Sequence, residues 1–296
     1  MVNVRVVTRA DGEYPDELRE IGSPPETLWI RGRRLDDLGP RVAIVGSRTP
    51  TPYGEHVAED LAADLAAFGV CIVSGLARGA DGAAHRGALS TDRGTTIAVL
   101  GTGVDVCHPK NHRRLAEAVA ERGALVTEFP PETPGYPQNF RLRNRIISGI
   151  SLAVIVVQAG PNSGALITVE RALEQQRDIF AVPGNVDVEG SAGPNKLIKE
   201  GAHVCTGAGD VLEALKQRLD RAPAGTPPDL QKVASLGERP QAQQALLKEL
   251  TTTPRSLASA ALRAGLDATE ATKALVRLEL DGLVAKAPGG GWKRVR

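Results

Sequence analysis

The chain has 296 residues, of which 42% are hydrophobic and 24% are charged, and its net charge is +1 at pH 7. This length provides for one large domain or two domains with a buried core, and the composition excludes a chain that is disordered throughout. No run of about 18 apolar residues and no apolar N-terminal signal are present, so we expect a soluble, cytoplasmic protein that crosses no membrane.

Residues 1–41 are expected to form an N-terminal extension that packs on the core. After them, short apolar runs rich in β-branched residues predict seven strands. These runs lack the alternation of a half-exposed strand, which is typical of strands buried on both faces of a parallel sheet. They are Val42–Val45, Val70–Val73, Thr96–Leu100, Ala124–Phe129, Leu152–Val157, Asp178–Val182 and Ala202–Cys205.

Helical patterns lie between these runs. Gly54–Phe68 places Val57, Leu61 and Leu65 on one stripe, and Ala165–Arg177 repeats the pattern. Alternation of strands and helices predicts an extended, Rossmann-like, doubly wound α/β domain over residues 42–220, with a mainly parallel sheet. Ligands of such domains bind outside the carboxyl ends of the strands.

Residues 221–240 contain four prolines and two glycines, which predicts a linker. Residues 241–296 then predict a small winged-helix-like domain, with helices over Gln241–Leu250, Ser256–Ala264 and Ala268–Asp281 and a two-stranded wing over Leu283–Ala287 and Trp292–Val295. Such a domain binds either DNA or protein, and its pattern does not choose between them.

Charge is distributed unevenly between the two parts. Residues 236–296 hold ten Lys and Arg against six Asp and Glu, a net +4, which leaves a net −3 on the preceding residues. A basic C-terminal part is consistent with nucleic-acid binding, although solvation alone explains many such clusters. Candidate DNA contacts are Lys273, Arg277, Lys286, Lys293 and Arg294.

Glycine-rich or polar loops follow several of the predicted strands. Glycine lets backbone N–H groups approach an anion, and a helix N-terminus adds positive partial charge, so several such loops at one sheet edge favour a phosphate site. No Walker A sequence is present, and neither Gly46-Ser47-Arg48 nor Gly101-x-Gly103 completes a GxGxxG fingerprint. A P-loop ATPase is excluded, and a hydride-transfer enzyme is poorly supported.

Arginines stand in or near these loops. Phe140 is followed by Arg141, Arg143 and Arg145, and a helix brings Phe140, Arg143 and Asn144 to one face. Arginine binds phosphate bidentately, and a neighbouring ring can stack on a base. The alternative is a solvated helix start with Phe140 in the core.

The sequence gives little support to a metal site or to nucleophilic catalysis. Cys107, His108 and His112 lie close together, but Pro109 interrupts the register and no HExxH pattern is present. His85 has no evident nucleophile to activate. Cys71, Cys107 and Cys205 form no CxxC pair and are expected to be reduced thiols. We predict no catalytic residue, no metal and no cofactor.

In this order, the motifs resemble the DprA/Smf family, DNA-processing protein A of bacterial natural transformation. The resemblance spans roughly residues 14–206. It is carried by Val45-Gly46-Ser47-Arg48, Ser74–Asp81, Ala84-His85, Gly101–Asp105 with Pro109 and Asn111, Glu128-Phe129-Pro130, Phe140 with Arg143–Ser151, Ser163–Thr168, Phe180–Gly184 and Ser191–Ile198. Ala80, His108, Thr127 and Gln158 depart from the residues common in the family.

The resemblance implies a homodimeric, non-enzymatic mediator that binds and protects single-stranded DNA and loads the RecA recombinase onto it. It also implies a set of residues that face the DNA. These are Gly46, Ser47, Arg48, Ser74, Gly75, Arg78, Gly79, Asn111, Phe140, Arg143, Asn144, Arg145, Ser163, Gly164 and Thr168. Duplex DNA is a candidate ligand of the C-terminal domain.

Two other functions stay open at this point. Ser163-Gly164, Thr168 and Glu170 loosely resemble the motif of nucleoside-monophosphate phosphoribohydrolases, in which Glu170 would assist N-glycosidic cleavage. A regulatory transcription factor is the other, but the predicted recognition helix offers few donors for base edges.

Overall fold

The computed structural model describes residues 4–220, 241–251, 254–280, 283–287 and 290–295. They divide into two compact units, one holding residues 4–220 and the other the described residues from 241 onward. The predicted linker 221–240, Asp281 and the Pro288-Gly289 part of the predicted turn lie outside the described residues. Within the described ranges, no helix combines the length and apolarity needed to span a bilayer.

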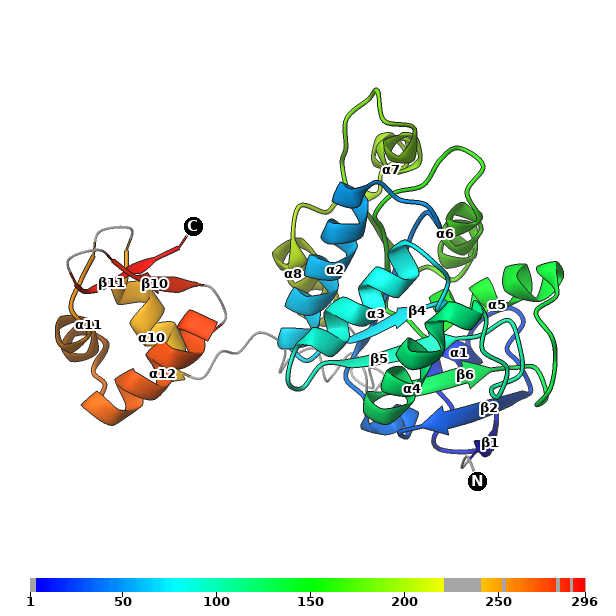
Figure 1. Ribbon diagram of the computed structural model, residues 1–296, viewed down its shortest axis with the longest axis horizontal. Coiled ribbons are helices and arrows are strands. Elements are labelled where there is room, and N and C mark those ends of the chain that lie inside the picture. The colour runs from blue at the N-terminus through cyan, green and yellow to red at the C-terminus, as the bar shows by residue number, and fades with distance from the viewer. Residues whose placement is uncertain (1–3, 221–240, 252–253, 281–282, 288–289, 296) are drawn as a thin grey trace. The chain divides into compact units, whose positions relative to one another are not determined.

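A nine-stranded sheet in the order β1-β2-β6-β5-β4-β3-β7-β8-β9 organises the first unit (Figure 1). Neighbouring strands from β3 to β9 pair in parallel, whereas β1 pairs antiparallel with β2, and β2 with β6. The predicted doubly wound, mainly parallel α/β fold is confirmed. The strands are β1 (Val4–Thr8), β2 (Thr27–Gly32), β3 (Arg41–Val45), β4 (Cys71–Ser74), β5 (Thr95–Val99), β6 (Ala124–Thr127), β7 (Ala153–Val156), β8 (Asp178–Ala181) and β9 (His203–Val204).

Helices cover both faces of this sheet. Val42 and Ile44 of β3 point to one face, where α2, α3 and α8 pack, and Ala43 and Val45 point to the other. This two-sided burial is the reason that the central strands read as unbroken apolar runs. The helices are α1 (Asp16–Arg19), α2 (Pro52–Ala67), α3 (Ala80–Ser90), α4 (Arg113–Arg122), α5 (Pro137–Gly149), α6 (Gly164–Glu174), α7 (Glu189–Lys199) and α8 (Ala208–Asp220), with 3₁₀ turns η1 (Leu35–Asp37) and η2 (Lys110–His112).

Strands β1 and β2 had no counterpart among the strands predicted from the sequence, which began at residue 42. Along β2, buried Leu28 and Ile30 alternate with less buried neighbours, and β1 exposes Val6. Alternation of this kind marks antiparallel strands at a sheet margin and does not give an unbroken apolar run. The N-terminal segment therefore extends the sheet.

Strand order reverses between β3 and β7. From β3 the chain proceeds outward through β4, β5 and β6, and it then returns to β7 on the other side of β3. Loops that leave the carboxyl ends of these two strands diverge and open a crevice between them. The Gly46-Ser47-Arg48 loop follows β3, and residues 157–163 follow β7.

The second unit has its own small core, formed by Leu246, Leu250, Leu275, Leu278 and their neighbours. Its helices are α10 (Gln241–Glu249), α11 (Leu257–Ala264) and α12 (Ala268–Leu280), and its antiparallel strands are β10 (Val284–Lys286) and β11 (Trp292–Arg294). Ser256 caps α11 by accepting from the Ser259 backbone N–H, and Gly265 ends it with φ 67°. The predicted winged-helix architecture is confirmed.

Candidate nucleic-acid interface

Two glycines allow the loops after β3 and β4 to lie against each other. A Cβ at Gly46 would come within 2.7 Å of the Ala80 Cβ, and Gly79, with φ 73°, lies directly against the Ser47 carbonyl. The Ala80 N–H donates to that carbonyl at 3.1 Å, and the Ser47 N–H donates to the Gln158 carbonyl at 2.6 Å. The three loops at the switch point are thus held together by their backbones.

Gln158, one of the departures from the family pattern, belongs to this scaffold. Its side-chain oxygen accepts from the Thr51 N–H at 2.9 Å, and its side-chain nitrogen donates to the Thr51 hydroxyl at 3.0 Å. Thr51 in turn caps α2 by accepting from the Gly54 N–H. A neutral amide at this position anchors the start of α2 and does not line the crevice.

Asp81 shapes the loop after β4. Its carboxylate accepts from the backbone N–H groups of Gly75 and Ala77 at 3.1 and 3.3 Å. The carboxylate is buried, which raises its pKa, and the nearby Arg143 guanidinium opposes that rise. The Asp81 carboxylate therefore accepts hydrogen bonds from the backbone of its own loop.

Arg143 presents a buried cation at the bottom of the crevice. Its side chain comes from α5, donates to the Val99 carbonyl at the end of β5, and lies against Gly75, where any Cβ would strike the guanidinium. Burial lowers the pKa of Arg143 to about 10, so the group stays charged at neutral pH. The Arg143 Nε has no partner among the described residues.

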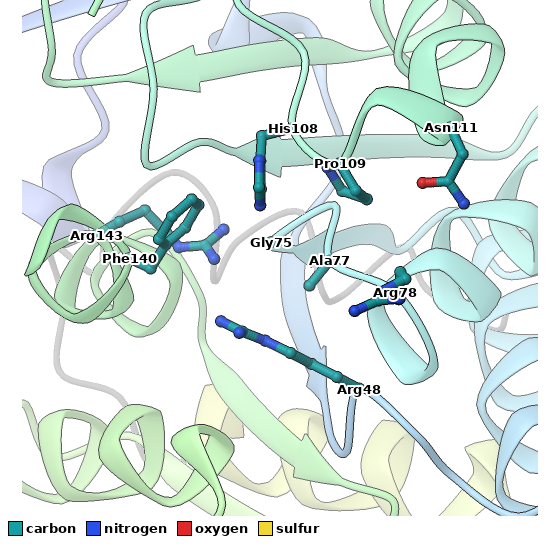
Figure 2. A pocket seen from close by; sticks show the side chains of 9 residues that line it. All are labelled: Arg48, Gly75, Ala77, Arg78, His108, Pro109, Asn111, Phe140 and Arg143. Carbon is teal, nitrogen blue, oxygen red and sulfur yellow. The ribbon is translucent and has the colours of Figure 1, made fainter. Parts of the chain in front are cut away.

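Two connected cavities occupy the crevice. The smaller, of about 240 Å³, adjoins a wider one of about 790 Å³, and they share five lining residues. Figure 2 shows Phe140 and Arg143 on one side of the smaller cavity and Arg78 and Asn111 on the other, with Arg48 reaching across below them. We call this continuous depression the groove. The shared residues are Arg48, Ala77, His108, Phe140 and Arg143.

Three further arginines of the groove are exposed. Arg48, Arg78 and Arg141 have no carboxylate partner among the described residues. Two carboxylates also line the wider cavity: Asp81 is bound to backbone N–H groups, and Glu189 lies at the other end near Gly160. The middle of the groove is therefore cationic.

An aromatic pair forms one wall. The rings of His108 and Phe140 are 5.1 Å apart between centroids and inclined by 42°. Phe140 is only partly buried and packs against Gly101 and Gly135. Phe140 therefore does not lie wholly in the core, which was the alternative expected from the sequence. A wall of this kind offers an apolar surface to a base, next to cations suited to its phosphate.

At its far end the groove meets the N-terminus of α6. The Ser163 hydroxyl accepts from the Ala165 N–H at 3.3 Å, and Asn144 Nδ2 donates to the Gly164 carbonyl at 3.3 Å. Thr168 is nearly inaccessible but lines the wider cavity. Helix N-termini carry positive partial charge, which favours an anion here.

The structure brings together most of the residues singled out from the sequence. Those that line the groove are Gly46, Ser47, Arg48, Gly75, Arg78, Asn111, Phe140, Arg143, Asn144, Ser163, Gly164 and Thr168. The sequence reasoning did not include His108, Arg141 and Asn162, which also line it. Arg141 stands in the Phe140–Arg145 run and His108 precedes Pro109, so both lay beside motifs that had been recognised.

Three residues of the set lie elsewhere. Ser74 is inaccessible and donates to the Ile44 carbonyl at 2.7 Å, while Gly79 shapes the backbone. Arg145 makes two hydrogen bonds of 2.7 Å to the Glu128 carboxylate, and neither side chain is more than 16% exposed. Within the described residues, Arg145 does not line the groove.

The candidates for catalysis do not meet in the groove. Glu170 is exposed and lines neither cavity. His85 is inaccessible, its Nδ1 lies 2.7 Å from the Thr96 hydroxyl oxygen, and burial lowers its pKa to about 3. No cluster of three or more His, Cys, Asp or Glu suited to a metal occurs in the described ranges, where the three cysteines are free.

The C-terminal candidates are spread over several surfaces of the second unit. Lys273 lies on α12 in a shallow depression with Thr269, Thr272 and Val276. In the wing, Val284 pairs with Arg294 and Lys286 with Trp292, whereas Lys293 pairs with Ala285. Because neighbouring residues of a strand face opposite sides, Lys293 points away from the face of Lys286 and Arg294. Arg277 is on α12.

Both units of the chain match known protein families. Residues 5–216 match the family of DNA recombination-mediator protein A, and residues 220–290 match the DprA winged helix domain. Protein Smf of Escherichia coli strain K12 is 42% identical over 288 residues, which cover 95% of this chain and 75% of that protein.

Two solved structures are also similar. DNA processing protein A from Streptococcus pneumoniae aligns with a TM-score of 0.68 and 42% identity, over 71% of this chain and 74% of the other. DNA processing protein A from Helicobacter pylori, whose structure was described for its single-stranded DNA binding mode, aligns with a TM-score of 0.65 and 28% identity, over 73% and 97% of the two chains.

Proposed function

The chain belongs to the DNA recombination-mediator protein A family, a family of DNA-binding mediators and not of enzymes, and we propose that it binds single-stranded DNA in the groove. The observation that carries this proposal is the set of four groove arginines, Arg48, Arg78, Arg141 and Arg143, none bonded to a carboxylate in the described residues. The relative from Helicobacter pylori is described as binding single-stranded DNA.

Within the groove, backbone phosphates would contact the guanidinium groups and the N-terminus of α6. A base would lie against Phe140 and His108, whose rings form the apolar wall. A duplex would have to bring two stiff backbones to a depression lined on several sides by loops, so we expect a single strand to be preferred. Recognition of this kind depends little on sequence, because phosphates and ring faces are common to all nucleotides.

We further propose that the protein protects incoming single strands in the cytoplasm during natural transformation and loads RecA onto them. The family's role as a recombination mediator supports this proposal. A homodimer is also proposed: Leu173 on α6 and Val204 on the edge strand β9 are 60% and 46% exposed, and both are apolar side chains that a second copy would cover. The C-terminal unit is proposed as a secondary contact for duplex DNA.

Fluorescence anisotropy of a labelled oligo-dT and of its duplex, measured over a salt series, tests the proposed function. With three to five phosphate contacts per subunit, the log–log slope for the single strand should be roughly −2 to −3.5. Duplex-favoured binding would move the main site to the winged helix, and absence of binding at low salt would refute the proposal. A RecA-loading assay follows if the single strand is preferred.

A further inference from the structure

A second group of cations lies outside the groove, where the groove ends at Asn111. Lys110, Arg113 and Arg114 are exposed, on η2 and the first turn of α4. Lys110 stands between Pro109 and Asn111, both of which line the smaller cavity. We call these three residues the basic track.

The basic track is fixed to the same loop that carries Arg78. The His112 Nδ1 lies 3.0 Å from the Leu76 carbonyl, and since a carbonyl only accepts, this nitrogen donates. Arg78 follows Leu76 by two residues in that loop. The groove and the basic track are therefore parts of one surface with a set geometry.

Charges in the basic track are not neutralised by the protein. Arg113 contributes only a long-range charge to Glu117, whose two carboxylate oxygens both accept from Arg31; that hydrogen bond is the main reason that the pKa of Glu117 is lowered. Arg114 and Lys110 have no ion pair within the described residues. Two exposed arginines on other parts of the unit, Arg86 and Arg171, are by contrast paired with glutamates.

Placing these cations at the start of a helix is unfavourable for the helix itself. The N-terminus of a helix carries positive partial charge and favours acidic residues, yet the first turn of α4 has none and begins with two arginines. His112, at the N-cap position, makes no side-chain capping bond. Both features leave a local excess of positive charge that an external anion would relieve.

We propose that the basic track binds the backbone phosphates of the single strand after it leaves the groove past Asn111. This inference rests on the proposed function and extends it, because it gives the strand a direction out of the groove and a second, sequence-independent stretch of contacts. Affinity should therefore depend on strand length even after the groove is filled.

The test compares Arg113→Gln/Arg114→Gln with Arg33→Gln/Arg93→Gln. Arg33 and Arg93 are exposed and unpaired within the described ranges, and they lie next to the end of β2 and the start of β5, at the sheet edge opposite the groove. Each variant removes the same two charges. Anisotropy would be measured over a salt series with an oligo-dT of about 4 nucleotides and another of about 16, the usual span of single-strand sites.

With the longer strand, Arg113→Gln/Arg114→Gln should reduce the steepness of the log–log slope by about 1.4, or about 0.7 for each lost contact. With the shorter strand its binding should equal that of the unsubstituted protein, and the control should be unchanged with both. Unchanged binding of the longer strand would contradict the proposal that the basic track binds DNA. An equal loss of affinity for both strands would contradict it too. If the unsubstituted protein binds neither strand, the proposed function itself fails.

Discussion

The exposed arginines of the groove and Arg41, which holds the N-terminal segment to the sheet, have the same side chain in opposite surroundings. Arg41 is 2% exposed, and its guanidinium donates to the Glu17 carboxylate at 2.9 Å and to the Ile150 carbonyl at 2.8 Å. Arg48 and Arg78 are exposed and bonded to no carboxylate in the described residues. The group to which an arginine is bonded, more than its position in a motif, therefore distinguishes a structural arginine from one that is free to bind a ligand.

Helix α5 contains both kinds within two residues. Arg143 lines the groove, while Arg145 is bonded to Glu128. Residues two apart on a helix point about 200° away from each other, so the two guanidinium groups reach different sides of α5.

Loss of a buried partner should have the largest effect. Glu17→Ala removes one partner of a buried ion pair, and we expect it to lower the free energy of unfolding by about 3–5 kcal/mol in urea titrations. Single-stranded DNA binding by the folded fraction should be unchanged. A loss below about 1 kcal/mol would mean that this pair does not hold the N-terminal segment.

Buried His85 should make the free energy of unfolding depend on pH. Thr96 donates its hydroxyl proton to the Ile72 carbonyl, so it accepts from His85 Nδ1, and the buried His85 Nε2 has no partner in the described residues. Burial lowers the pKa of His85 to about 3, below the ordinary value of about 6.5. The unfolded chain therefore binds a proton that the folded chain does not between these values.

As the pH falls from about 6.5 towards 3, this residue should reduce the free energy of unfolding by up to about 1.4 kcal/mol per pH unit. His85→Gln should remove that part of the slope, as measured by urea titrations from pH 7 to 5. Equal slopes in the two proteins would show that His85 becomes protonated in the folded state.

Arg143→Gln should mainly weaken DNA binding, whereas Arg145→Gln should mainly lower the stability of the fold. Arg143→Gln should lower affinity for oligo-dT about tenfold and reduce the steepness of the salt slope by about 0.7. Arg145→Gln should leave the slope unchanged and lower the free energy of unfolding by about 1.5 kcal/mol, because a charged and partly buried hydrogen-bonded pair is lost. A reduced slope in Arg145→Gln would place Arg145 at the DNA and contradict the contrast.

An exposed pair should have the smallest effect. Glu26 is 80% exposed in its pair with Arg9, so Glu26→Ala should change the free energy of unfolding by less than about 1 kcal/mol. It is the matched control for Glu17→Ala, since both remove a glutamate bound to an arginine. Similar losses in the two variants would mean that burial does not distinguish them.

Sequence patterns predicted the central sheet well and its margin poorly. Strands such as β3 are apolar on both faces, which leaves an unbroken run in the sequence, whereas β2 alternates and carries Arg31. The same limit applies to the site. Glycine loops mark the sheet edge because the backbone there needs them, but the pairing of Arg145 with Glu128 depends on the tertiary fold. The helical period separates Arg145 from Arg143, but it does not show that Arg145 meets Glu128.

The most direct test of the groove is the salt dependence of oligo-dT anisotropy for Arg48→Gln/Arg78→Gln, measured beside Arg33→Gln/Arg93→Gln. Both variants lose two exposed arginines, but only the first pair lines the groove. We predict that the groove variant loses affinity and that its slope becomes shallower by about 1.4, while the control keeps the slope of the unsubstituted protein. Equal slopes for all three proteins would contradict the assignment of the groove as the site for single-stranded DNA.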